Sequence, residues 1–404
     1  RIYGGPNVEV GLSICVGNEG QYCLFGYTNS YGAGGYDMML YFIDDQGAVL
    51  SSHTYGSVDW EFGTRIIPSD EGYLLIGDVY GSTFGGKDGR LMKIAENGEV
   101  LWEKDFGGEG DDELSDITLN DEGDIYLCGS KETSEGIFHA WITRLDSEGD
   151  LIWVKLYNED APDSEWRATG MTIVDNQPVV CGNYRVTLED EFDIFLSKFD
   201  EIGELVWEKI DANPGLQVLW DVEAFSNGFI TTGTTDEWGL GGLGAMLQRR
   251  SVGGGWLQGP VFGEDQDEES FKILIDAENR LLVLGSTNSY SEFDDDDIYL
   301  IRFEDPMIVS SYDLELAHYQ DTWLNISETE NTAGENVLYR IQNRLVFSDP
   351  LWHPTGVIML DVSGRIVGVS RGVGDIDIAN FPSGIYMIKS TDGAQTQIHR
   401  IYNP

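Results

Sequence analysis

The chain has 404 residues, of which 71 are acidic and 24 basic, so its formal charge at pH 7 is −47. A charge this negative argues against a nucleic-acid partner, whose phosphates would be repelled. No apolar run is long enough to span a bilayer as a helix, so we expect no transmembrane segment.

From the N-terminus onward, short apolar runs of strand length alternate with turn residues, and this pattern recurs six times. The glycine that ends the second run of each repeat falls at Gly26, Gly77, Gly129, Gly182, Gly233 and Gly285, in steps of 51, 52, 53, 51 and 52 residues. A period near 50 with four strands per unit is typical of β-propeller blades. We therefore predict an all-β fold with a six-bladed β-propeller, and a seven-bladed one as the alternative.

Two further landmarks accompany the glycine. An acidic residue opens the third run at Asp37, Asp88, Asp193 and Asp297. We predict that it accepts hydrogen bonds from a neighbouring loop. A tryptophan occurs after the next turn at Trp102, Trp153, Trp207 and Trp256. Because one four-stranded blade cannot bury both of its faces alone, we predict that these tryptophans pack between blades.

The first residues look like the end of a repeat, since Arg1–Gly5 is similar to the stretch from Asp105 to Gly108. This segment either pairs with the last blade or belongs to an upstream blade. The chain opens on Arg1 rather than Met, so we expect a processed or trimmed chain without its signal peptide.

The four cysteines give a weak redox signal. Cys15 and Cys23 flank a turn and would lie directly opposite each other if Val16 pairs with Tyr22. A disulfide there suits an exported protein, but cross-strand geometry is often strained, so both states stay open. Cys128 and Cys181 are predicted to be buried free thiols.

A change in charge marks a domain boundary after the repeats. Residues 333–404 carry six acids and six bases, so the whole net charge of −47 lies before them. We predict a propeller over 1–318, a linker over 319–334, and a small Ig-like β-sandwich of short strands over 335–404.

Two stretches of this tail carry a specific pattern. One runs from Val357 through Asp361-Val362-Ser363-Gly364-Arg365 to Val367, and the other from Ile376 through Pro382-Ser383-Gly384-Ile385-Tyr386 to Lys389. Together they resemble the type A C-terminal sorting domain of Bacteroidota type IX secretion cargo. The Pro-Asn-Pro usual near the start of such domains is absent, and Phe347-Ser348-Asp349-Pro350 stands nearby. The repeats resemble, more weakly, the propeller repeats common in such cargo.

The resemblance implies passage through the periplasm and export across the outer membrane by the type IX translocon. It also implies that outer-membrane shuttle or sortase components recognise residues 335–404, leaving the passenger secreted or anchored to the cell surface. The residues that carry the signal would be Asp361, Ser363, Gly364, Arg365, Pro382, Ser383, Gly384, Ile385, Tyr386 and Lys389.

Ligands of propellers usually bind where loops converge on the central channel, and acidic and aromatic residues recur in the loops before each first strand. We predict that the channel-face residues are Asp59, Trp60, Asp111, Asp112, Asp163, Trp166 and Asp267. Their carboxylates could bind Ca²⁺ or a cationic group, and their aromatic rings could stack on a glycan. The alternative is a solvated acidic face.

The run from Asp294 to Asp297 is a second candidate for Ca²⁺, with Asp294, Asp295 and Asp296 as ligands. It lacks the spaced pattern of a calcium-binding loop. Apart from this ion, we expect no cofactor.

No catalytic constellation stands out, because carboxylates are too abundant for any pair to be conspicuous. We therefore predict a propeller that is not an enzyme and serves binding or adhesion, with a glycan or another surface ligand as its partner. The alternative is an extracellular hydrolase or lyase that degrades polysaccharide.

Overall fold

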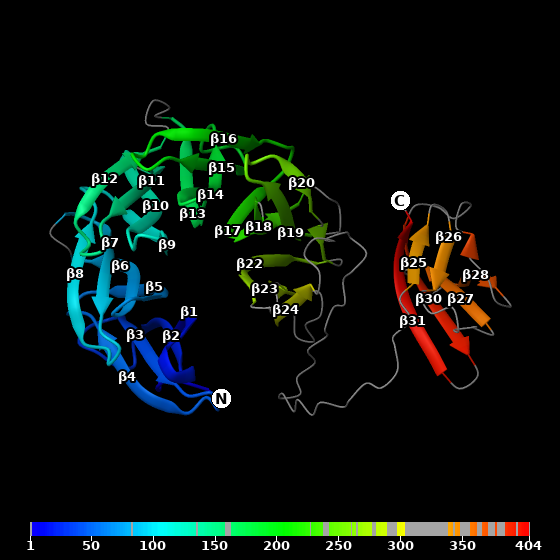
Figure 1. The fold of residues 1–404 in the computed structure, drawn as a ribbon, viewed down its shortest axis with the longest axis horizontal. Coiled ribbons are helices and arrows are strands. Elements are labelled where there is room, and N and C mark those ends of the chain that lie inside the picture. The colour runs from blue at the N-terminus through cyan, green and yellow to red at the C-terminus, as the bar shows by residue number, and fades with distance from the viewer. Residues whose placement is uncertain are drawn as a thin grey trace. The chain divides into compact units, whose positions relative to one another are not determined.

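The computed structural model is all-β, and six blades form a β-propeller (Figure 1). It describes residues 2–303 except 82–83, 135, 158–162, 227, 237–241, 260, 264–265, 277–279 and 289–296, and the backbone of strands between 338 and 403. The prediction of six blades is confirmed.

Each blade is an antiparallel sheet whose strands follow one another in chain order. Blades 1 and 2 contain β1 (Glu9–Val16), β2 (Tyr22–Thr28), β3 (Asp37–Ile43), β4 (Val49–Tyr55), β5 (Glu61–Ser69), β6 (Gly72–Tyr80), β7 (Lys87–Ile94) and β8 (Val100–Phe106), with a 3-10 turn at Asn18–Gly20. Blades 3 and 4 contain β9 (Asp112–Leu119), β10 (Ile125–Ser134), β11 (Ile137–Leu145), β12 (Leu151–Leu156), β13 (Glu165–Val174), β14 (Gln177–Arg185), β15 (Asp193–Phe199) and β16 (Leu205–Asp211). Blades 5 and 6 contain β17 (Gln217–Phe225), β18 (Gly228–Thr235), β19 (Gly244–Ser251), β20 (Trp256–Gln258), β21 (Val261–Phe262), β22 (Glu268–Ile275), β23 (Leu281–Thr287) and β24 (Asp297–Phe303).

The first strand of each blade is the innermost, and these strands surround the centre of the propeller (Figure 1). From blade 2 onward, this inner strand packs against the first three strands of the preceding blade; β5, for example, contacts β1, β2 and β3. The hydrophobic clusters accordingly span two neighbouring blades, as when Tyr126 of blade 3 joins Phe195 of blade 4. Burial between blades, rather than within one sheet, therefore holds the fold together.

The landmark glycine has a steric cause. A Cβ on Gly26 would lie 1.9 Å from the carbonyl oxygen of Val10, and one on Gly129 would lie 1.8 Å from that of Glu113. At all six glycines the added carbon would come within 2.2 Å of an inner-strand carbonyl oxygen. Any larger residue would push the second strand away from the inner strand.

The same place in every blade carries a β-bulge in the inner strand. In blade 1 the pairing register shifts between Gly11 and Ser13, next to the Gly11–Gly26 pair. The other five blades show a shift at the matching position. The extra residue bends the inner strand towards its neighbour, and this bend is what brings the carbonyl against the glycine.

The turn between third and fourth strands forms the joint between blades. Gly149 has a φ of +77°, and a Cβ on it would lie 2.8 Å from the ring of Trp102 in the preceding blade. Trp153 in turn donates from Nε1 to the carbonyl of Glu201, at 2.9 Å. The prediction that these tryptophans pack between blades is confirmed for Trp102, Trp153 and Trp207, which border hydrophobic clusters. Trp256 differs, because 59% of it is exposed.

Two of the acidic residues that open the third strands, Asp37 and Asp88, anchor loops as predicted. Asp37 accepts hydrogen bonds from the backbone N–H groups of Ala33 and Gly34, at 3.1 and 3.3 Å. Asp88 accepts one from Gly108 at 3.2 Å. Their carboxylates replace the backbone partners that these loops lack.

The first and the last blade each have apolar side chains that are more exposed than those packed between neighbouring blades. Ile14 and Val16 of β1 are 62% and 63% exposed, and Ile298 of β24 is 77% exposed. Among the described residues, no strand of blade 6 packs against β1 as β1 packs against β5. Apolar faces that are buried in the other seams are therefore open here.

The first hairpin has the strand register that the sequence predicted around its two cysteines. Cys15 lies opposite Cys23 and Val16 opposite Tyr22 in the β1–β2 ladder. Both are free thiols, as are Cys128 and Cys181, which are fully buried as predicted.

The chain divides into two compact units, Arg1–His318 and Tyr319–Pro404. In the second unit the strands β25 (Leu338–Ile341), β26 (Arg344–Phe347), β27 (Gly356–Asp361), β28 (Ile366–Ser370), β29 (Ile376–Asp377), β30 (Gly384–Asp392) and β31 (Gln395–Asn403) form two sheets. Their orders are β25-β26-β29 and β28-β27-β30-β31. That they make an Ig-like sandwich stays a prediction.

We predict that Gly26→Ala destabilises the propeller by about 3 kcal/mol, because the methyl group would displace the Val10 carbonyl. The control is Gly11→Ala in the facing strand, where an added Cβ meets nothing within 4 Å. Gly11→Ala should be neutral or slightly stabilising. Thermal unfolding of both variants tests this, and equal melting temperatures would contradict the steric explanation.

Candidate functional site

A group of ion pairs bridges blades 2, 3 and 4 where the inner strands begin. Lys87 of β7 contacts the Glu113 carboxylate of β9, and its Nζ lies 3.7 Å from Oδ2 of Asp78 in β6. Arg167 of β13 reaches the same Glu113 at 3.5 Å. Two carboxylates from neighbouring blades thus share one lysine, and we call Asp78 and Glu113 the carboxylate pair.

Asp78 is the most perturbed member of this group. Its side chain is 15% exposed. Burial raises the pKa of Asp78 to about 7, with the neighbouring Glu113 adding to the rise and Lys87 opposing it. Its Oδ1 accepts a hydrogen bond from the backbone N–H of Leu114 at 3.3 Å. A carboxyl group that titrates near neutral pH can donate a proton there, as a general acid must.

The matching position in blade 4 holds a neutral side chain. Asn183 also follows a landmark glycine and also faces the inner strand of the next blade. It accepts from the N–H of Leu219 at 2.7 Å and donates to the Leu219 carbonyl at 3.2 Å. Asp78 shares the first of these bonds, because it accepts from the N–H of Leu114, and its other oxygen faces Lys87 instead of a carbonyl.

An aromatic cluster borders the carboxylate pair. Phe62 lies directly opposite Asp78 in the β5–β6 ladder. Trp60 packs edge-on against Tyr36, Phe62 and Tyr80, with ring centroids 5.7 to 6.2 Å apart. Trp60 is 51% and Tyr80 39% exposed. These two rings offer a solvent-facing apolar platform beside two acidic groups.

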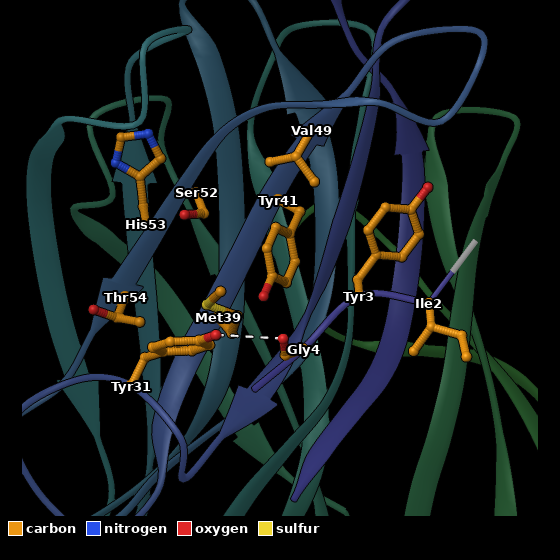
Figure 2. A pocket seen from close by; sticks show the side chains of 10 residues that line it. All are labelled: Ile2, Tyr3, Gly4, Tyr31, Met39, Tyr41, Val49, Ser52, His53 and Thr54. Atoms are coloured by element: carbon orange, nitrogen blue, oxygen red, sulfur yellow. Dashed lines mark hydrogen bonds between the residues drawn. The ribbon is translucent and has the colours of Figure 1, made fainter. Parts of the chain in front are cut away.

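A cavity of about 480 Å³ lies elsewhere, between the N-terminal segment and the outer strands of blade 1 (Figure 2). Tyr3 donates from its hydroxyl to the carbonyl of Gly47 at 2.9 Å, and Tyr55 donates to Gly98 in the same way at the next seam. Figure 2 shows Tyr3 and Tyr41 on the cavity wall, and Tyr31 bonded to Gly4. Because the Tyr55–Gly98 bond repeats the Tyr3–Gly47 bond, this cavity belongs to a packing contact between repeats.

The seven predicted channel-face residues fall into three groups. Trp60 and Asp111 adjoin the carboxylate pair, and Asp111 accepts a hydrogen bond from the N–H of Lys87 at 2.9 Å. Asp112 and Trp166 are buried, where they pair with Lys131 and stack on Tyr184. The remaining three are exposed: Asp59, Asp163 and Asp267.

The predicted calcium ligands Asp294, Asp295 and Asp296 lie outside the described residues. Within the residues that are described, no group of three or more His, Cys, Asp or Glu side chains could hold a metal ion. The same residues contain no helix that is long and apolar enough to cross a membrane.

Sequence reasoning missed Asp78, Lys87, Glu113 and Arg167. One signal was available, because Asp78 is the single acidic residue at the position after a landmark glycine. The other five repeats have Tyr27, Ser130, Asn183, Thr234 and Ser286 there.

No protein-family model matches the chain, and no curated protein matches its sequence. Among solved structures it is similar to a mutant puromycin hydrolase complexed with PGG, with a TM-score of 0.51 and 14% identity. That alignment covers 98% of this chain and 59% of the hydrolase, so the chain spans little more than half of its length. It is also similar to a Penicillium chrysogenum α-L-arabinanase complexed with arabinobiose, with a TM-score of 0.48, 12% identity, and coverage of 72% and 92%.

The likeness to the puromycin hydrolase shows the propeller fold. It contradicts the prediction that the propeller is not an enzyme, because that similar structure is an enzyme. That prediction rested on finding no conspicuous carboxylate pair, and the residues of the pair are 35 positions apart in different blades.

We predict that Asp78→Asn stabilises the propeller at pH 8 by on the order of 2 kcal/mol, and has little effect at pH 4. Because the folded pKa of Asp78 is raised from 3.8 to about 7, its contribution is present at low pH and lost as pH rises through 7. The asparagine cannot ionise, and it reproduces Asn183.

Thermal unfolding between pH 4 and pH 8 measures this difference. The control is Asp45→Asn, which alters an exposed carboxylate. A pH-independent effect of Asp78→Asn would show that burial does not raise the pKa of Asp78.

Proposed function

We propose that the propeller is an extracellular hydrolase that acts on carbohydrate, with the carboxylate pair as its acid–base machinery. The observation that carries the proposal is the position of Asp78 and Glu113 around Lys87, beside the exposed rings of Trp60 and Tyr80. Glycoside hydrolysis uses two carboxyl groups in different protonation states, and their surroundings set the difference.

In this proposal Asp78 is the general acid that protonates the leaving glycosidic oxygen. Glu113 is held by Lys87 and Arg167, and its charge stabilises the positive charge that develops on the sugar ring. As the glycosidic C–O bond breaks, water bonds to the anomeric carbon and gives its proton to Glu113, which acts as the general base. Trp60 and Tyr80 position the sugar by contact with its apolar face.

We also propose that residues 335–404 direct the protein through the type IX route to the cell surface or the medium. What supports this is the resemblance of the tail together with its separation as a compact unit. The two halves of the resembling pattern also adjoin, since Asp361 of β27 lies opposite Tyr386 of β30. The partners would be the translocon and the shuttle or sortase components of the outer membrane.

We expect Asp78→Asn to reduce the release of reducing ends from a susceptible polysaccharide by at least about 100-fold, the scale of general acid catalysis. Glu113→Gln should lose a similar factor, and Asp45→Asn should lose nothing. Wild-type kcat should fall as the pH rises above 7, because the acid must be protonated.

An aryl glycoside with a dinitrophenolate leaving group separates acid catalysis from misfolding. Its leaving group needs no proton, so Asp78→Asn should keep near wild-type activity on it. If Asp78→Asn lost both activities equally, or if the wild type cleaved no polysaccharide, the proposed function would be wrong.

Deletion of residues 335–404 should leave the propeller in the periplasm, while the full chain reaches the surface or the medium. Fractionation and immunoblotting of both forms measure this. As a control, residues 335–404 fused to a periplasmic reporter should carry the reporter outward. Appearance of the truncated protein in the medium would refute the sorting role.

A further inference from the structure

Each inner strand directs one residue out of its ladder at the β-bulge. The residue that the pairing register skips has no cross-strand partner, and a bulge re-aims its side chain. The inner strands surround the centre of the propeller (Figure 1), and each carries one such bulged residue. They are Leu12, Thr64, Ser115, Thr169, Trp220 and Phe271.

Two of the bulged residues have a clear structural task. The hydroxyl of Thr64 donates to the Leu114 carbonyl at 3.4 Å, and that of Thr169 donates to the Leu219 carbonyl at 2.7 Å. Each of these bonds ties one blade to the next. Blades 5 and 6 have large aromatic residues in place of such a tether.

Trp220 and Phe271 form a pair on neighbouring inner strands. Their ring centroids are 6.0 Å apart, with the planes inclined at 65°. Trp220 is 37% exposed, and Phe271 is half-buried. An exposed tryptophan in the middle of an inner strand costs apolar burial, which a stacked ligand would restore.

The charged groups around this pair are already matched. Lys272 lies 3.0 Å from Asp221, and Arg65 lies 2.6 Å from Asp116. Both aspartates also accept a backbone N–H from the following blade, so these pairs belong to the scaffold. Within the described part of these strands, Arg65 and Lys272 are thus both paired, which disfavours an anionic ligand.

Glu223 is an acidic residue on the same strand as Trp220. It lies two residues beyond Asp221 on β17, and burial and nearby charges, with no side-chain hydrogen bond, are what perturb it. Burial raises its pKa to about 7, with Asp221 adding to the rise and Arg65 opposing it. It can donate a hydrogen bond to a ligand hydroxyl when protonated and accept one when ionised.

We propose that Trp220 and Phe271, with Glu223, form a binding subsite on the inner strands of blades 5 and 6 for a neutral pyranose ring. An aromatic face with a few placed polar groups is the usual composition of a small-molecule site. The net charge of −47 and the paired cations select against acidic sugars. This subsite is separate from the carboxylate pair, so it stands or falls independently of the proposed hydrolysis.

The test uses the full chain and isothermal titration with cellohexaose, xylohexaose and mannohexaose as neutral probes, and an oligogalacturonate as the acidic one. Trp220→Ala should weaken binding of the preferred neutral hexaose at least tenfold, and Trp220→Phe should restore most of it. Glu223→Gln should weaken binding by less than Trp220→Ala does.

Trp256→Ala is the matched control, because Trp256 is 59% exposed but lies on the outer strand β20 of the same blade. It should bind as the wild type does. Asp45→Asn, which alters an exposed carboxylate, should also bind as the wild type does. The subsite is refuted if Trp220→Ala binds as tightly as Trp256→Ala, if the acidic probe binds as tightly as the neutral ones, or if no neutral hexaose binds.

Discussion

The structure depends on the close approach between the inner strand of each blade and the glycine of its second strand. A carbonyl oxygen occupies the space where a side chain would begin, as at Gly26 and Gly129. This contact lies beside the β-bulge of the inner strand, which bends that strand locally. One local distortion, repeated at intervals of 51 to 53 residues, therefore sets how the blades follow one another.

The same distortion makes room for chemistry. A bulge removes one side chain per blade from the ladder, and the residue after the landmark glycine contacts the inner strand of the next blade at Asp78 and Asn183. Where the repeat needs only stability, these positions hold Thr169 and Asn183, whose polar atoms bond to backbone of the following blade. Trp220 and Asp78 are different residue types at these positions, although the strands pair in the same way. Trp220 is exposed, and the pKa of Asp78 is raised.

The sequence was sufficient for the repeated parts of the fold and insufficient for the site. Glycines, turn residues and interblade tryptophans act within one repeat or between adjacent ones, so they recur at a fixed period and can be recognised without coordinates. The Cys15–Cys23 pairing was predictable because it follows from one short hairpin. The contact of Lys87 with Glu113 instead joins two blades through residues that no other repeat shares, and periodicity carries no information about such exceptions. Burial could not be read from the sequence either. Asp112 and Trp166 have the residue types of a ligand site, but both are buried inside the propeller.

In so acidic a chain, the scarce cations mark function better than the abundant carboxylates do. With 71 acidic residues, finding two carboxylates near each other says little, whereas each of the 24 basic residues must be accounted for. Arg65 and Lys272 hold aspartates that also bind backbone, and these pairs are structural. Lys87 differs, because its ammonium group lies near the carboxyl groups of both Asp78 and Glu113, which belong to different blades. It is therefore shared between them. The charge of Lys87 reduces the repulsion between the two carboxyl groups. The pKa of Asp78 is nevertheless raised, because burial disfavours its ionised form. The difference between the two carboxyl groups, rather than their number, is what makes this corner of the propeller suited to acid–base chemistry.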